Sequence, residues 1–154
     1  MDLVRLESHG TGFAATIQGR LGQGVLTGHD LLEGQLEVWS TFISGTTRHV
    51  FFREDLRAWA DVLDRLEAGE SASWLAESGR TAEVHFDTSE LPDVWIIEVD
   101  EPLGARAKAE MVVDVRDGWI EALRGQLADV LEAYPEETVE TSRGVRVWRR
   151  DIRE

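Results

Sequence analysis

Residues 51–69 read FFREDLRAWADVLDRLEAG, and this stretch decides the fold because its pattern is that of one amphipathic helix. Glu54 and Asp55 fall in the first turn, where carboxylates stabilise the positive end of the helix dipole. Gly69 is typical of the position just after a helix. The sequence therefore predicts a helix at about residues 53–68. Its buried face would carry the apolar residues that recur at helical spacing, which are Leu56, Trp59, Ala60, Leu63 and Leu66.

The segments before this helix alternate between apolar and polar residues, which predicts β-strands. Residues 13–21 alternate in this way, and residues 36–43 do so with Leu36, Val38 and Phe42 on one face. A turn at residues 44–46 would then lead into a partner strand at residues 47–52. The glycine-rich stretch between the first two predicted strands, residues 22–30, indicates a loop.

After the helix, the same order recurs: alternating segments typical of strands come first, and a segment with helical spacing follows. Three alternating runs predict further strands at residues 82–87, 95–99 and 105–113, and a second apolar stripe predicts a helix at about residues 118–134. Asp117 is the expected N-cap of that helix, and Pro135 ends it. The short connections favour antiparallel pairing. We therefore predict an α+β fold with antiparallel sheets of about seven strands and two amphipathic helices.

The charge of the chain is unevenly distributed. The 154 residues include 30 acidic and 16 basic side chains, a net charge of −14. Residues 136–154 contain five acids and five arginines, so residues 1–135 carry the whole net charge. We expect one domain at residues 1–135 and a C-terminal extension at residues 136–154, either an added strand or a flexible tail.

This acidity limits the classes of partner. Nucleic acids and anionic membranes require neutralising cations, so we expect neither as a partner. A basic protein would be attracted, although the acidity also fits a protein whose charge only prevents aggregation. The chain has no cysteine, no secretory leader pattern and no apolar run of about 20 residues. We therefore expect a cytoplasmic protein.

Chemical motifs are sparse. His29 and Asp30 lie together in the glycine-rich loop, and a histidine oriented by a carboxylate can act as a general base. No serine or threonine is marked as a nucleophile, so we predict no catalytic residue. The glycines of residues 22–24 lack the rest of a dinucleotide fingerprint. The four histidines lack metal-ligand spacing, so we predict neither a metal nor a cofactor.

Six tryptophans are a high count for this length. We assign those on predicted apolar faces to the core, namely Trp59, Trp95 and Trp119. Trp39 lies among polar residues and is either exposed or covered by a layer of helix. Trp74 falls in a stretch expected to be a polar loop or a short turn, residues 71–79, in which Trp74 and Leu75 turn back toward the body. Exposed indoles are frequent binding hot spots. The candidate partner-binding residues are therefore Trp39, Trp74, Glu37, His29 and Asp30.

Three stretches resemble an uncharacterised actinobacterial family of unknown function: GVLTGHD at residues 24–30, the helix from Glu54 to Gly69 followed by Trp74, and DGWI at residues 117–120. The similarity extends to about Pro135 and implies no activity. The layout from about Leu36 to Val99 is similar to immunity proteins of the WapI type. That resemblance implies a cytosolic protein that binds and blocks a toxin.

Three hypotheses follow. The first is a non-enzymatic protein-binding domain, immunity-like, that binds a basic partner through its acidic surface. The second is a small-molecule-binding or enzymatic domain centred on residues 22–30. The third is an assembly role in which a strand edge pairs with another copy of the chain.

Overall fold

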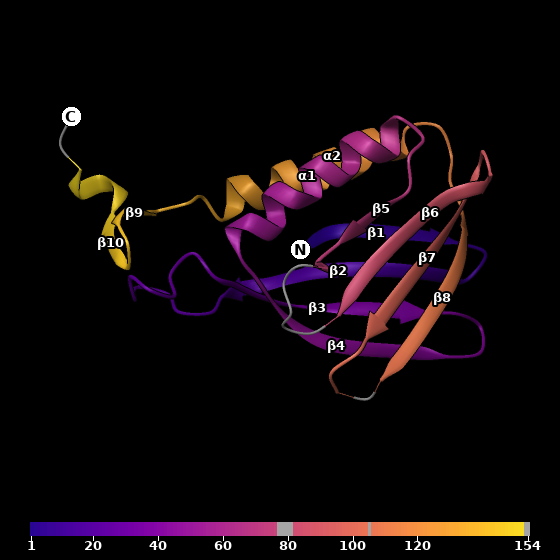
Figure 1. Ribbon diagram of the computed structural model, residues 1–154, viewed down its shortest axis with the longest axis horizontal. Coiled ribbons are helices and arrows are strands. Elements are labelled where there is room, and N and C mark those ends of the chain that lie inside the picture. The colour runs from indigo at the N-terminus through magenta and orange to yellow at the C-terminus, as the bar shows by residue number, and fades with distance from the viewer. Residues whose placement is uncertain (77–81, 105, 153–154) are drawn as a thin grey trace.

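The computed structural model describes residues 1–76, 82–104 and 106–152, and these residues form ten strands and two α-helices in an α+β fold. The first half is a four-stranded antiparallel meander followed by a helix (Figure 1). Its elements are β1 (Asp2–Ser8), β2 (Thr11–Arg20), β3 (Leu32–Trp39), β4 (Ser44–Phe51) and α1 (Arg53–Glu67). The predicted fold class and the first helix are confirmed.

The second half repeats this order. A second antiparallel meander leads into a second helix, and these elements are β5 (Ala72–Trp74), β6 (Glu83–Leu91), β7 (Val94–Glu101), β8 (Ala107–Asp114) and α2 (Trp119–Ala133). The two strand-to-helix junctions also share a sequence pattern: residues 50–56 read VFFREDL and residues 113–119 read VDVRDGW. This sequence similarity is confined to the two short junctions, so hydrophobic periodicity alone does not reveal it.

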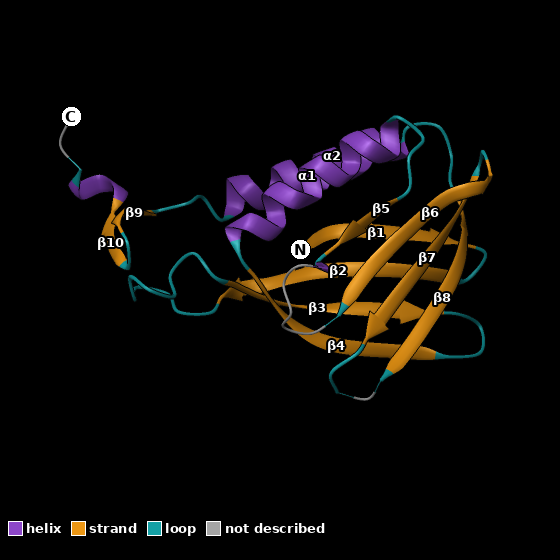
Figure 2. Ribbon diagram, viewed as in Figure 1, coloured by secondary structure: helices purple, strands orange, loops and turns teal. Residues whose placement is uncertain are grey.

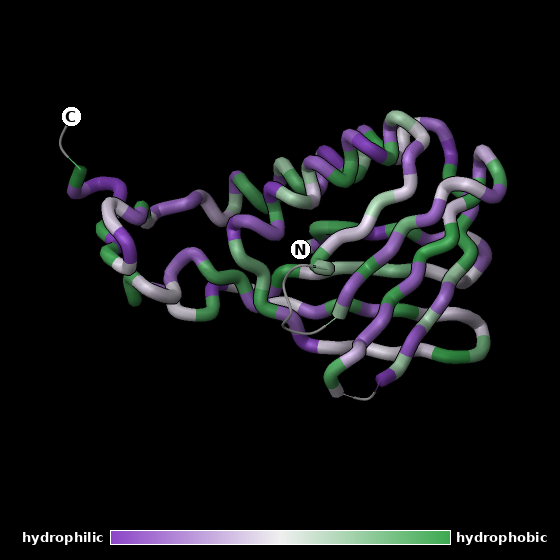
Figure 3. The backbone as a smooth tube through the Cα atoms, viewed as in Figure 1, coloured by the Kyte–Doolittle hydropathy of each residue, from purple (hydrophilic) through white to green (hydrophobic). Residues whose placement is uncertain are grey.

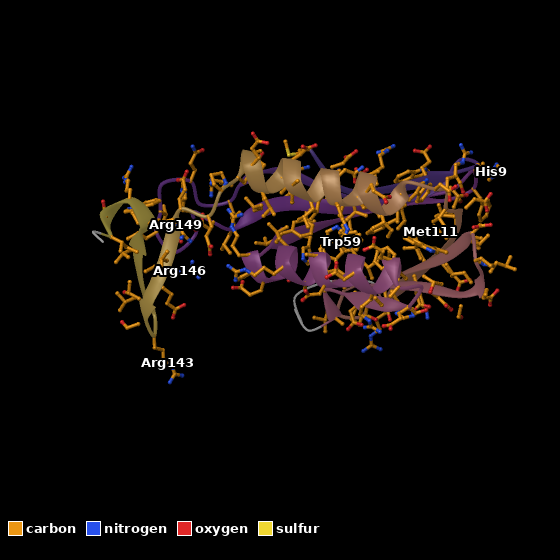
Figure 4. The ribbon with its side chains drawn as sticks, turned by 90° about the horizontal axis from the view of Figure 1, so that it is seen from above. His9, Trp59, Met111, Arg143, Arg146 and Arg149 are labelled. Atoms are coloured by element: carbon orange, nitrogen blue, oxygen red, sulfur yellow. The ribbon has the colours of Figure 1, made fainter. Side chains whose placement is uncertain are left out.

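The core lies between the two sheets and the helix pair. The helices lie side by side on one side of the molecule, and the sheets cross beneath them (Figures 1 and 4). Hydrophobic and hydrophilic residues alternate along the strands of both sheets, so each sheet has one face to bury (Figure 3). A chain of aromatic rings joins the layers, with Trp59 at 4.9 Å from Trp74 and 5.4 Å from Phe86 between ring centroids. Trp59 and Trp95 are buried as predicted, and Trp119 packs partly buried against the same core.

Local chemistry sets where the helices begin. The Asp55 carboxylate accepts a hydrogen bond from the Phe52 N–H at 2.8 Å and so caps the start of α1. The N-cap of α2 is Gly118 rather than the expected Asp117. Gly118 has φ of 86°, a left-handed conformation that glycine adopts without steric cost. The second helix is otherwise where the sequence predicts it.

Other boundaries differ from the prediction. β3 ends at Trp39, so the turn before β4 lies at residues 40–43 and not at residues 44–46. β1 and the short β5 were not predicted: β5 has only three residues, and in β1 the adjacent buried residues Leu3 and Val4 interrupt the alternation. Part of the loop expected at residues 71–79, and Ala105 of the third predicted strand, lie outside the described residues.

The C-terminal residues form a hairpin of β9 (Thr138–Ser142) and β10 (Val145–Trp148), followed by the 3-10 turn η2 (Arg149–Asp151). This hairpin is a separate two-stranded sheet that stands away from the two meanders (Figure 2). We call residues 136–152 the arm. Neither helix in the described residues is long and apolar enough to cross a lipid bilayer.

Candidate partner-binding surface

His29 is buried and held by contacts within the chain. The N–H of Gly24 donates to His29 Nδ1 at 2.9 Å, so Nδ1 is the acceptor nitrogen and Nε2 carries the proton. His29 Nε2 in turn lies 2.6 Å from the Glu137 carboxylate. Because both ring nitrogens are engaged, this histidine has no free nitrogen with which to act as a general base.

Asp30 is also buried, with its side chain 3% exposed. Its Oδ1 accepts from Arg20 Nη1 at 2.9 Å and from the Glu137 N–H at 3.1 Å. Its Oδ2 accepts from the N–H and the hydroxyl of Thr138, at 2.8 and 2.6 Å. Burial alone would raise the pKa of this carboxyl, but the hydrogen bonds from Thr138, Glu137 and Arg20 outweigh it and lower the pKa to about 2.

Two arginines complete this cluster. Arg20 Nη2 and Arg53 Nη2 donate to the carbonyl oxygen of Pro135 at 2.7 and 3.2 Å, and Arg53 lies 3.5 Å from Asp30. We call Arg20, His29, Asp30 and Arg53 the latch, because together they hold the root of the arm. The structure therefore places His29 and Asp30 in an internal contact, where they are covered by the arm.

The other candidate residues lie in two different environments. Trp74 is 1% exposed, and its indole N–H donates to the Asp55 carbonyl at 2.9 Å, so Trp74 turns back into the core and is not an exposed indole that could contact a partner. It lies on the inner face of β5, because Ala72 and Trp74 face the core and Ser73 faces outward. Trp39 lies half-buried on the outer face of the first sheet, where Glu37 is its neighbour.

Two contacts fix the Trp39 side chain on that outer face. The Arg5 guanidinium lies 5.0 Å from the Trp39 ring centroid, in a cation–π geometry. The ring also covers Gly12, where an added Cβ would lie 2.4 Å from the indole. Trp39 is thus fixed at the end of β3, directly before the turn that leads into β4.

That turn exposes two large apolar side chains. Phe42 is 88% exposed and Ile43 is 62% exposed. We call Thr41, Phe42 and Ile43 the tip. Ser40 closes the turn, because its Oγ accepts from the N–H groups of Phe42 and Ile43 at 3.1 and 3.0 Å. Sequence reasoning missed the tip because it read these residues as part of a strand with one buried face.

The outer face of the second sheet is acidic. The alternation of β6, β7 and β8 points six carboxylates outward, and Lys108 is the lysine among them, bound to Glu98 at 2.8 Å. The six are Glu83, Asp87, Glu98, Asp100, Glu110 and Asp114. His9 Nε2 lies 2.7 Å from Asp114, which links this face to the turn between β1 and β2. The tip borders the same turn, since an added Cβ on Gly10 would lie 3.2 Å from Thr41.

A groove of about 730 Å³ runs beside α1 and β5 and contains a serine–histidine pair. The Ser73 hydroxyl lies 2.8 Å from His85 Nδ1. Catalysis would need a carboxylate to orient the histidine, and the neighbouring Glu98 is bound to Lys108. In the described residues no three or more histidine, aspartate or glutamate side chains are grouped so that they could hold a metal ion.

A family model matches most of the chain. The model of a family described as "Family of unknown function (DUF5959)" covers residues 1–135. The chain therefore belongs to this family, and the match ends where the arm begins. No curated protein matches the chain.

Proposed function

We propose that this member of the DUF5959 family is a non-enzymatic protein-binding domain that anchors a basic partner through the tip. The observation that carries this proposal is the pair of exposed apolar side chains, Phe42 and Ile43, on a turn closed by Ser40. Single exposed apolar residues are common on protein surfaces, but two adjacent ones on a fixed turn next to Trp39 form a compact anchor.

The energetics favour such an anchor. Burying a phenylalanine side chain stabilises a complex by about 1.5–3 kcal/mol. The turn is already ordered by the Ser40 hydrogen bonds, so little conformational entropy is lost when the tip binds. Burial of the Phe42 side chain would therefore contribute to affinity without an added cost of ordering the turn backbone.

The charge of the body supports a basic partner. Residues 1–135 carry a net charge of −14, and the outer face of β6–β8 is acidic. Such a field speeds association with a positively charged protein, and the effect weakens as salt rises. A nuclease toxin would fit this description, because binding nucleic acid requires a basic surface. We therefore propose the immunity-like function that the resemblance to WapI-type proteins implies, in which the protein binds and blocks a toxin in the cytoplasm.

The enzymatic alternative has less support. It relied on His29 and Asp30 in an open loop, whereas both side chains are buried and engaged in the latch. The Ser73–His85 pair lies on an outer sheet face, where water competes for the hydroxyl. We therefore favour binding over catalysis.

The test begins with affinity capture from the native host by three immobilised proteins. These are the wild type, a Phe42→Ser/Ile43→Ser variant, and a Leu103→Ser control that removes another exposed apolar side chain, 68% exposed in the turn between β7 and β8. A captured protein is then purified and titrated by calorimetry. A toxin gene immediately upstream would support the immunity-like form.

We expect the purified partner to be basic and its association rate to fall with salt. The tip variant should bind about 10–100-fold more weakly, and the control should match the wild type. Equal affinity of the tip variant and the wild type would show that the tip is not the anchor. An acidic partner, or an association rate that does not depend on salt, would show that the acidic surface does not attract the partner.

A further inference from the structure

We propose that the latch is a binding site for an extended peptide, occupied here by residues 135–138 of the same chain, and that it accepts the same segment from a second copy of the chain. The arm would then exchange between two molecules. The latch and the tip are independent sites, since the arm lies at one end of the molecule and His9, on the turn beside the tip, at the other (Figure 4).

The contacts of the latch are those of a peptide-binding site. Asp30 accepts two successive backbone N–H groups, from Glu137 and Thr138, and Arg20 and Arg53 donate to the backbone carbonyl of Pro135. Main-chain hydrogen bonds of this kind hold extended peptides in many recognition sites. Specificity comes from the Thr138 hydroxyl, which Asp30 also accepts.

The site is assembled by the body rather than by the arm. Arg20 bonds Asp30 at 2.9 Å, Arg53 lies 3.5 Å from Asp30, and Gly24 orients the His29 ring. All of these contacts join residues within the first half of the chain. The receiving groups therefore have internal partners that do not depend on which molecule supplies the segment.

The arm is suited to exchange. It follows the end of α2 at Tyr134 and Pro135, so a change of direction at this one joint redirects the whole arm. β9 and β10 pair with each other and form a sheet of their own, so the hairpin keeps its pairing when it moves. Exchange of an identical element needs no new interface, because the contacts made between molecules are those already made within one.

The charge of the arm is compatible with binding to a second copy of the chain. The arm, residues 136–152, contains four acids and four arginines, so it is neutral and is not repelled by the acidic body of another copy. Two bodies of −14 do repel each other, and salt screens this repulsion. Arm exchange should therefore strengthen with salt, whereas the binding of a basic partner at the tip should weaken.

The test uses two full-length variants that complement each other. Asp30→Asn damages the latch and leaves the arm intact. Glu137→Pro/Thr138→Val removes one backbone N–H, the Glu137 carboxylate that bonds His29 and the Thr138 hydroxyl from the segment, and leaves the four latch residues unchanged. In each variant the contact between the latch and the segment of the same molecule is weakened. That segment otherwise competes with the segment of a second molecule at an effective concentration of about 1 mM.

Light scattering after size exclusion is the readout, and circular dichroism confirms that each variant is folded. We expect each variant alone to be a monomer and the mixture to contain a heterodimer whose fraction rises with salt. A mixture that contains only monomers would overturn the proposal.

A labelled peptide of residues 134–152 covers the case in which Asp30→Asn does not fold. We expect fluorescence anisotropy to detect binding to the Glu137→Pro/Thr138→Val protein and at least about tenfold weaker binding to the wild type, whose latch is occupied. The same peptide with Thr138→Val should lose affinity. A peptide with Thr141→Val should not, because Thr141 lies in the exposed outer part of β9. Absence of binding to the folded variant would overturn the proposal.

Discussion

Replacing Asp30 with asparagine tests the energetic role of the latch directly. The carboxylate accepts four hydrogen bonds, two at each oxygen, from Arg20, Glu137 and Thr138. Asparagine keeps one acceptor oxygen and turns an NH₂ group toward two of these donors. Two bonds are then lost, and the buried Arg20 and Arg53 lose their negative partner.

The magnitude can be worked out in two ways. Net losses of about 1.5–3 kcal/mol for each hydrogen bond to a charged group give about 3–6 kcal/mol for two bonds. The lowering of the Asp30 pKa from 3.8 to about 2 corresponds to about 2 kcal/mol of preferential stabilisation of the carboxylate. Relaxation around the site reduces the first figure, so we expect a loss of about 3 kcal/mol in the free energy of unfolding.

Urea denaturation followed by tryptophan fluorescence measures this loss. Trp148 packs against His29 with ring centroids 4.8 Å apart, so its fluorescence also reports release of the arm. Hydrogen exchange at the Glu137 and Thr138 amides should accelerate in the variant. A loss below about 1 kcal/mol, with unchanged exchange at both amides, would refute the view that Asp30 holds the arm.

Four other changes test the latch carboxylate, the sheet, the core and the tip. Lowering the pH from 4 toward 2 should remove about 2 kcal/mol of stability from the wild type but not from Asp30→Asn. The Asp30 carboxyl has a lowered pKa, so it stabilises the fold only while it is ionised. Acid titrations of both proteins check this. Gly34→Ala should lower the unfolding free energy by about 3 kcal/mol, since the added Cβ would lie 2.0 Å from the Thr16 carbonyl oxygen; a shift of the urea midpoint measures it. Trp74→Phe should cost about 1–3 kcal/mol because it leaves the Asp55 carbonyl without the indole N–H, and thermal denaturation would detect this. Phe42→Ser should leave the melting temperature within about 2 °C of wild type, because the side chain makes little contact with the fold.

The sequence was sufficient for the elements with a long and regular pattern. The helix after β4 shows five apolar residues at helical spacing, and it begins and ends within one residue of the prediction. The regular alternation of apolar and polar residues and the short connections likewise predicted an antiparallel α+β fold. Short elements such as β5 have too few residues to show a period.

The candidate site was harder to predict because exposure depends on contacts between distant residues. Trp74 looked like an exposed indole in a polar stretch, but Trp59 and Phe51 pack against it in the core. Phe42 looked like one member of a buried strand face. The Ser40 side chain closes a turn at residues 40–43, ahead of the predicted turn at residues 44–46, and leaves Phe42 in solvent.

By itself, the amino-acid sequence determined the fold class, both helices, the acidity of residues 1–135 and the family of the chain. These are properties of composition and of periods within one segment. Only the tertiary structure decided that His29 and Asp30 serve the arm, whose residues are more than 100 positions away in the chain. Hydrogen bonds between a loop and a distant segment leave no local pattern, because each side chain is satisfied by a partner that folding brings to it.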